Sequence, residues 1–306
     1  MKKIFLEIVL FTAGAVLFVG ILRHFGFEAT FSTLAKAGPG VFAVLLLYPF
    51  MSMFDVLSWR FCFGEAWVGR ARFVSLFFIR LAGEALNNIT PFIDIGGEPL
   101  KAHLCERHLG IPIASAVSST VVSRTSLLLS EALFMFSGLA LSFWLMPLET
   151  KSRWELVLAL GVVCAAFLGF LFVQQKEWLR KLNPEIARHY ADERPRFVRA
   201  VFFNCLGWIA GGCEMFLFCR LMGMDVSLIK ALMLESLLQL VRVASFFIPG
   251  NLGAQEGGLA FFIGQLGYDP VIGLGLSLLK RFRQLLWTAV GFVIWGFYRY
   301  RDPGTK

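Results

Sequence analysis

The sequence reads PFIDIGGEP at residues 91–99 and PGNLGAQEGG at residues 249–258. In both stretches the opening proline is followed seven residues later by a glutamate, which is Glu98 in the first stretch and Glu256 in the second. Both stretches lie in strongly apolar surroundings, where an ionised side chain is costly unless it is paired or lines a wet cavity. An ionisable residue that recurs in two such apolar surroundings favours a transport pathway over a soluble active site.

The similarity continues downstream of each glutamate. A leucine-glycine pair follows at residues 109–110 and again at residues 266–267, and a proline comes soon after each pair. An arginine then lies 26 residues after the first glutamate and 25 residues after the second, at Arg124 and Arg281. The two halves of the chain therefore carry two copies of one pattern.

The composition indicates a membrane protein. Hydrophobic residues make up 57% of the 306 residues, and charged residues make up 16%. A soluble domain carries roughly 25% charged residues, so this chain lacks the polar surface that water would cover. We therefore predict an all-α, polytopic integral membrane protein. The net charge of +8 bears on membrane topology, and we expect no nucleic-acid partner.

Six stretches approach the roughly 20 apolar residues that cross a bilayer. They are residues 4–22, 41–59, 127–146, 156–173, 197–222 and 286–298. Three further apolar stretches are short or are interrupted by polar residues and glycine. They are residues 73–90, 228–248 and 252–266. Broken segments at matching places in two halves are typical of re-entrant or discontinuous helices.

Lysine and arginine in the loops predict the orientation. The most basic loop, at residues 174–199, and both the N- and the C-terminus are expected on the cytoplasmic side. Counted from that loop, the first copy (residues 73–147) enters the membrane from the cytoplasm and the second copy (residues 228–299) enters from outside. We therefore predict a single transmembrane domain over residues 1–306 with two inverted repeats, which can open to either face in turn.

Glycines surround both glutamates, and we single out Gly97 in the first copy and Gly253 in the second. Glycine adopts φ > 0 cheaply, and a glycine-rich turn before a helix exposes N–H groups that suit an anion. A phospholipid phosphate is one such anion. The same glycines would also let a hairpin turn tightly, and the sequence leaves both interpretations open.

Arg124 and Arg281 are the predicted phosphate ligands, because arginine can bind phosphate through two parallel hydrogen bonds and stays charged. Glu98 and Glu256 could pair with these arginines, receive a cationic headgroup or take up a proton. The alternative is that ion pairs such as Arg281–Glu256 or Arg124–Glu131 merely hold helices together. The recurrence of the arginines in register favours a role in binding.

Polar side chains also lie near each proline. Asn87 and Asn88 occupy one predicted helix face in the first copy, and Arg242 lies on the corresponding face of the second. Gln255 directly precedes the second glutamate. We include these four among the predicted substrate-binding residues. In the functional interpretation, these two polar helix faces border one water-filled cavity. In the structural interpretation, they form a polar contact between packed helices.

No motif of a known enzyme or metal site is present. The sequence contains no GxSxG, HExxH or Walker A motif. Its six cysteines are scattered and form no CxxC pair. We therefore expect neither catalysis nor a metal or other cofactor.

Four segments together resemble the lysylphosphatidylglycerol synthase transmembrane-region family, which is also called the flippase-like family. They read EALNNITPFIDIGGEPLKAHL (residues 84–104), SSTVVSRTSLLL (118–129), PGNLGAQEGG (249–258) and LSLLKRFRQLLW (276–287). The Asn-Asn-x-x-Pro and Gly-x-Gln-Glu-Gly-Gly stretches are most similar to the hopanoid-associated HpnL branch of this family.

The resemblance implies a membrane-embedded lipid translocase. We expect it in the bacterial inner membrane with membrane lipids as partners, and the alternative function below would add lipid-biosynthesis enzymes. Full-length synthases attach a soluble aminoacyl-transferase domain after the membrane part. This chain ends at Lys306, a few residues past its last predicted span, so we expect no such domain and do not carry over aminoacylation. The family often has an acidic residue before the first-copy arginine, whereas Ser123 occupies that position here.

We therefore expect a flippase or transporter that moves a modified phospholipid or a hopanoid-type lipid between leaflets, through a polar cavity between the repeats. The alternative is a membrane subunit of a lipid-biosynthesis complex that moves no lipid itself. An intramembrane transferase is disfavoured because the sequence has no metal-binding carboxylate clusters.

Overall fold

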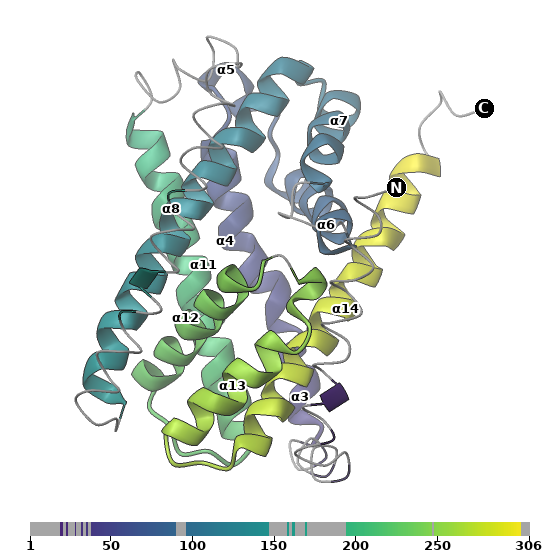
Figure 1. The fold of residues 1–306 in the computed structure, drawn as a ribbon. Coiled ribbons are helices and arrows are strands. Elements are labelled where there is room, and N and C mark those ends of the chain that lie inside the picture. The colour runs from purple at the N-terminus through teal and green to yellow at the C-terminus, as the bar shows by residue number, and fades with distance from the viewer. Residues whose placement is uncertain are drawn as a thin grey trace, which may run out of the picture. The chain divides into compact units, whose positions relative to one another are not determined.

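The computed structural model describes residues 38–89, 96–146, 194–246 and 248–300, together with isolated positions between residues 19 and 35 and between residues 158 and 169. Every element assigned in these residues is helical, which confirms the predicted all-α class (Figure 1). The spans predicted at residues 4–22 and 156–173, most of the basic loop and both chain ends lie almost entirely outside the described residues.

The described helices keep the numbering of Figure 1. They are α3 (Gly40–Leu45), α4 (Leu47–Phe61), α5 (Glu65–Val68), α6 (Phe73–Ile89), α7 (Gly97–Leu109), α8 (Ile113–Leu145), α11 (Arg194–Leu221), α12 (Leu228–Ala244), the 3-10 helix η1 (Pro249–Asn251), α13 (Ala254–Gln265) and α14 (Pro270–Tyr300). Among the described residues, three helical stretches have the length and apolar composition to cross a membrane. They are Gly40–Phe61, which joins α3 and α4, and the whole of α8 and of α11.

Both copies of the sequence pattern fold into two short helices followed by one long helix. These are α6, α7 and α8 in the first copy and α12, α13 and α14 in the second. The short helices pack as pairs, α6 on α7 and α12 on α13. Arg124 lies eleven residues after the first residue of α8, and Arg281 lies eleven residues after the first residue of α14. The two arginines therefore occupy the same position of their helices.

The repeated glycine and proline mark where a short helix ends and a long one begins. Gly110 (φ 62°) comes directly after α7, and Gly267 (φ 83°) comes two residues after α13. Both lie in the left-handed region, which glycine adopts without a Cβ clash. Pro112 precedes α8 and Pro270 is the first residue of α14, where a helix needs no N–H donor. The shared pattern thus encodes one helix junction twice.

The long helices begin earlier than the apolar spans predicted at residues 127–146 and 286–298. Serine and threonine in the added part of α8 donate to carbonyl groups of the preceding turn, as Ser119 does to Ala116 (2.7 Å). A hydroxyl that bonds to its own helix in this way needs no partner outside it. The length of an apolar run therefore underestimates the length of the helix.

The chain divides into two compact units. Unit 1 contains Met1–Tyr48, Ala132–Phe170 and Ile209–Arg283, and unit 2 contains Pro49–Glu131, Leu171–Trp208 and Gln284–Lys306. The pair α12 and α13 belongs to unit 1, and the pair α6 and α7 belongs to unit 2. Each unit therefore holds one of the two short-helix pairs, together with parts of the long helices.

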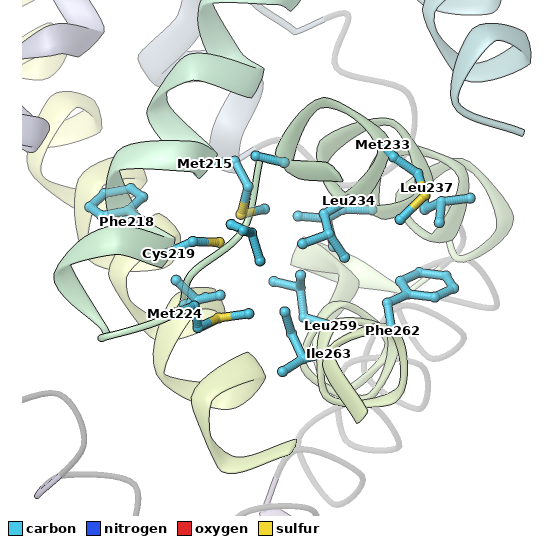
Figure 2. Close-up of a cluster of buried hydrophobic side chains, with 14 of the residues drawn as sticks. Met215, Phe218, Cys219, Met224, Met233, Leu234, Leu237, Leu259, Phe262 and Ile263 are labelled. Atoms are coloured by element: carbon cyan, nitrogen blue, oxygen red, sulfur yellow. The ribbon is translucent and has the colours of Figure 1, made fainter. Parts of the chain in front are cut away.

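The core of unit 1 consists largely of sulfur-containing and aliphatic side chains from α11, α12 and α13 (Figure 2). Its fully buried members include Met215, Phe218, Cys219, Met233, Leu234, Leu237, Leu259 and Ile263. The close approach of α8 to α12 uses Gly138, where a Cβ would overlap the side chain of Ser236. Small residues at such contacts are typical of membrane helices, because packing replaces the hydrophobic effect there.

The core of unit 2 combines larger aromatic residues with aliphatic ones. Its most buried members include Val56, Trp59, Cys62, Phe63, Leu76, Ile79, Cys105, Ile111 and Val122. Here α14 contributes Gly291, where a Cβ would overlap the carbonyl oxygen of Leu81 in α6. In each unit, a glycine at a helix crossing therefore lets two helices pack closely.

Gly97→Ala is expected to lower the free energy of unfolding by about 1–3 kcal/mol, because the new methyl group would overlap the carbonyl of Gly83 and force α6 and α7 apart. Unfolding in mixed detergent micelles with increasing dodecyl sulfate measures the change. Gly296→Ala is the control, since nothing lies within 4 Å of the place that its new Cβ would occupy in α14. Equal stability of the two variants would contradict the close helix contact.

Candidate functional site: a closed arginine clamp and an open arginine cavity

The ten predicted site residues divide equally between the units. Unit 1 holds Arg242, Gly253, Gln255, Glu256 and Arg281. Unit 2 holds Asn87, Asn88, Gly97, Glu98 and Arg124. The two sets derive from the same sequence pattern, yet their charges are paired differently.

In unit 1, Arg281 and Glu256 form a direct ion pair. Arg281 Nε donates to Glu256 Oε1, and Arg281 Nη2 donates to Glu256 Oε2 at 3.0 Å. The Glu256 side chain is fully buried, and 16% of the Arg281 side chain is exposed. The guanidinium fork thus matches the carboxylate in the two-bond geometry that arginine favours. The ion pair joins α14 to α13, as in the alternative interpretation in which Arg281 and Glu256 hold helices together.

Arg281 also holds the turn between α12 and α13. Its Nη1 donates to the carbonyl oxygen of Gly250 (2.9 Å), and its Nη2 donates to that of Asn251 (3.2 Å). Glu256 in turn accepts from the backbone N–H of Gly253 (2.8 Å), the residue that precedes α13, and so satisfies one of the free donors at the start of this helix. The arginine, the glutamate and the glycine-rich turn therefore form one unit of structure, which we call the Arg281 clamp.

Hydrogen bonds extend the Arg281 clamp to α12. Arg242 Nε donates to Gln255 Oε1 (3.0 Å), and Gln255 Nε2 donates to Ser277 Oγ (2.9 Å). Ser277 Oγ completes the path by donating to Glu256 Oε1 (3.0 Å). All five predicted residues of unit 1 therefore belong to a single network that joins α12, α13 and α14.

In unit 2, Glu98 pairs with a lysine that was not among the predicted site residues. Lys101 Nζ lies 2.8 Å from Glu98 Oε1 and 2.9 Å from Glu84 Oε1. Lys101 comes three residues after Glu98, one helical turn away, whereas the residue three after Glu256 is Leu259. The spacing of three was the available signal, because side chains at that distance meet on a helix.

The two asparagines of unit 2 have different partners. Asn87 Oδ1 accepts from the backbone N–H of Gly97 (2.6 Å), and Asn87 Nδ2 donates to Glu98 Oε1 (3.5 Å). Asn88 Nδ2 instead donates to Thr288 Oγ1 in α14 (2.8 Å), and Asn88 Oδ1 accepts from Gln284 (3.1 Å). Asn87 thus orders the start of α7, while Asn88 links α6 to α14.

Arg124 lines a polar cavity inside unit 2. The charged residues around this cavity are Asp55, Arg80, Glu84, Glu98, Lys101 and Arg124. About 40 Å³ is open to the centres of water molecules, which is room for roughly three waters. We refer to it as the Arg124 cavity.

The charges of the Arg124 cavity balance in number but not in pairing. Arg80 pairs with Asp55 at 2.6 Å, and Lys101 pairs with both Glu84 and Glu98. Arg124 makes no hydrogen bond or ion pair with any residue that the structure describes. Of the three cations around the cavity, it is therefore the one without a carboxylate partner in the described part of the chain.

A buried charge cluster in unit 1 is an additional feature that was not predicted from the sequence. Lys280 Nζ lies 2.7 Å from Glu235 Oε2 and 3.5 Å from Glu214 Oε2, and Arg283 also pairs with Glu214. The side chains of Lys280 and Glu214 are 1% and 0% exposed. The available signal was Glu214 itself, since an acid inside an apolar span needs a partner.

The family comparison covers both arginine sites. The family model described as lysylphosphatidylglycerol synthase TM region matches residues 4–291. The chain belongs to this family. A UPF0104 membrane protein of Methanothermobacter thermautotrophicus is 23% identical over an alignment 314 positions long, which covers 89% of each of the two chains. No solved structure matches the chain.

Membership in the lysylphosphatidylglycerol synthase transmembrane-region family confirms the resemblance found in the sequence at the level of the family. The matched residues include both short-helix pairs, the Arg281 clamp and the Arg124 cavity. Both arginine sites therefore belong to the membrane region that the family model describes.

Proposed function

We propose that this protein moves an amphipathic membrane lipid between the two leaflets, and that the lipid headgroup passes through the Arg124 cavity. The observation that carries the proposal is Arg124 itself, a cation without a partner among the described residues, in a cavity where the other charges are paired. Membership in a membrane-region family supports a lipid-related role.

In this proposal, a headgroup phosphate accepts hydrogen bonds from the Arg124 guanidinium. The ion pairs around the cavity offer further polar partners of both signs, which lowers the cost of moving a headgroup through an apolar environment. The acyl chains or the polycyclic tail of the lipid stay in the hydrocarbon region. The Arg281 clamp has a different role, because its arginine already holds a carboxylate.

Transport requires the cavity to widen. Space for roughly three waters is far less than a phospholipid headgroup needs, so the described conformation is closed to the substrate. We propose that residues 73–147 and 228–299 are inverted repeats whose relative motion opens the cavity to either leaflet. The identical helix order and the matched positions of Arg124 and Arg281 support a duplication.

The proposed substrates are a modified phospholipid or a hopanoid-type lipid, and the proposed location is the bacterial inner membrane with both termini in the cytoplasm. The Arg124 cavity favours the lipid that bears a phosphate, because arginine binds this group through charge-assisted hydrogen bonds. A hopanoid-type lipid without a phosphate would depend on the neutral and paired groups of the cavity.

Arg124→Gln is expected to slow lipid movement at least about tenfold, because one charge-assisted contact to the headgroup is lost. Purified protein in liposomes with a trace of fluorescent phosphatidylglycerol measures the rate, since dithionite bleaches only the outer leaflet. Arg124→Lys should retain part of the rate because it keeps the charge. The free energy of unfolding should stay close to that of the wild type.

Arg220→Gln is the matched control, since Arg220 pairs with Asp225 in an exposed position and outside the Arg124 cavity. This control is expected to move lipid at the wild-type rate. Movement at the wild-type rate by Arg124→Gln would overturn the proposed pathway. If the wild type moves neither phosphatidylglycerol nor a hopanoid-type lipid and instead co-purifies with a lipid-biosynthesis enzyme, the non-transporting subunit replaces the flippase.

A further inference from the structure

Unit 2 contains a second cavity that shares no residue with the Arg124 cavity. Its volume is about 320 Å³, and it is lined by residues of α4, α5 and α11, among them Arg60 in α4 and Arg196 and Arg199 in α11. The remaining wall is formed by Leu57, Phe61, Glu65 and Val68. We call it the three-arginine pocket.

The charge of the three-arginine pocket is poorly compensated. Glu65 is the acidic residue among the lining residues that the structure describes, and its Oε1 lies 3.9 Å from Arg196 Nη1. The Glu65 side chain is 86% exposed, so water screens its charge strongly. Arg60 and Arg199 have no carboxylate partner among the described residues, and their two positive charges leave a potential in the pocket that favours an anion.

Arg60 gives an independent sign of a missing acceptor. Its Nε atom is buried and has no hydrogen-bond partner among the described residues. Buried polar groups are nearly always hydrogen-bonded, and a charged donor without an acceptor is especially costly. Arg60 and Arg199 form no ion pair with the described residues. Two arginines of the pocket thus keep donors for an external acceptor.

The pocket is held in shape by contacts of the other groups. Arg196 Nη2 donates to the carbonyl oxygen of Phe63 (2.6 Å), which fixes the start of α11 to the end of α4. The Arg199 guanidinium lies 5.9 Å from the centre of the Phe61 ring, which stacks on Phe203 at 5.5 Å. The arginines therefore stand beside an ordered apolar surface, and a ligand would not need to assemble the site.

The position of the pocket along the helices matches a membrane interface. The apolar stretch Gly40–Phe61 ends at the pocket, and the apolar helix Arg194–Leu221 begins there. The ends of membrane-spanning helices lie at the level of lipid headgroups. The arginines of the pocket are therefore expected at the depth of the lipid phosphates.

We propose that the three-arginine pocket binds the phosphate of an anionic membrane phospholipid, with an acyl chain against Leu57, Phe61 and Val68. Basic pockets between membrane helices are suited to anionic headgroups, and arginine is the residue that matches a phosphate most closely. This lipid is a bound component of the protein and is distinct from the lipid proposed to pass through the Arg124 cavity.

The test measures how much phospholipid remains with the purified protein. Protein exchanged into mild detergent with mixed phosphatidylglycerol and phosphatidylcholine is analysed by native mass spectrometry. The wild type is expected to retain phosphatidylglycerol in preference to phosphatidylcholine. Arg60→Gln/Arg199→Gln is expected to retain at least about tenfold less phosphatidylglycerol. Arg199→Gln alone, at an exposed position, provides the same comparison if the double variant does not fold.

Arg72→Gln/Arg194→Gln is the matched control, because it removes two exposed arginines that do not line the pocket. It is expected to retain lipid like the wild type. Equal retention by the pocket variant and this control would overturn the site. A thermal shift separates lipid from free anion: phosphatidylglycerol should raise the melting temperature of the wild type, and an equal rise with inorganic phosphate would overturn the assignment to a lipid.

Discussion

Lys280→Met is expected to lower the free energy of unfolding by about 3–5 kcal/mol, the cost of removing one partner from a buried ion pair. Lys280 is 1% exposed and lies between Glu235 and Glu214, so its loss removes the ion-pair partner of the buried Glu235, while Glu214 keeps Arg283. Methionine keeps most of the length and the apolar stem of lysine. Unfolding with dodecyl sulfate in mixed micelles measures the difference.

Two further variants of this cluster separate charge from packing. Lys280→Met/Glu235→Leu is expected to recover much of the loss, because removing both partners leaves no unpaired charge between them. Lys230→Met is the control, since its side chain makes no described ion pair near the start of α12. A single variant as stable as Lys230→Met, or no recovery in the double variant, would contradict the buried pairing.

Arg281→Gln is expected to cost a similar amount, about 3–5 kcal/mol. It leaves the fully buried Glu256 without its counter-ion and releases the carbonyl groups of Gly250 and Asn251. Hydrogen–deuterium exchange should therefore rise in the turn between α12 and α13, in addition to the loss of global stability. Exchange measured by mass spectrometry over residues 249–258 tests this local effect.

The type of positive charge matters at this position. Arg281→Lys is expected to recover only part of the loss, because an ammonium group cannot reproduce the two-bond contact and reach both carbonyl groups. Arg220→Gln breaks an exposed pair and should change stability by less than about 1 kcal/mol. If Arg281→Gln proves as mild as this control, the clamp contributes little to the fold.

The helix order could be predicted from the sequence, because glycine and proline act locally. The left-handed backbone at Gly110 and Gly267 and the helix starts beside Pro112 and Pro270 follow from the residues themselves. The apolar runs also located the parts of α4, α8 and α11 that can cross a membrane. The boundary of α8 failed where serine and threonine continue the helix, since hydroxyls such as that of Ser119 bond within it. The boundary of α14 failed where the charged residues Lys280 and Arg281 continue the helix, since their partners come from other helices.

The pairing of charges could not be predicted from the repeat. Arg124 and Arg281 occupy equivalent helix positions, and a sequence comparison assigns them the same role. Their partners depend on side chains elsewhere in the fold, such as Lys101, which engages the glutamate of the first copy. The repeat thus predicts the position of each arginine on its helix. Whether the arginine has a carboxylate partner depends on neighbouring residues that differ between the two copies.

Lys101 has a consequence for comparing relatives of this protein. The first copy has a lysine three residues after its glutamate, and the second copy has Leu259 at that place. In the second copy, which has leucine there, Glu256 pairs with Arg281. In the first copy, which has lysine there, Glu98 pairs with Lys101, and Arg124 lines the cavity without a carboxylate partner among the described residues. This one column of an alignment is therefore a diagnostic position. The residue at this position should indicate, for each half of a homologue, whether the arginine of that half is paired with the glutamate or lacks a carboxylate partner.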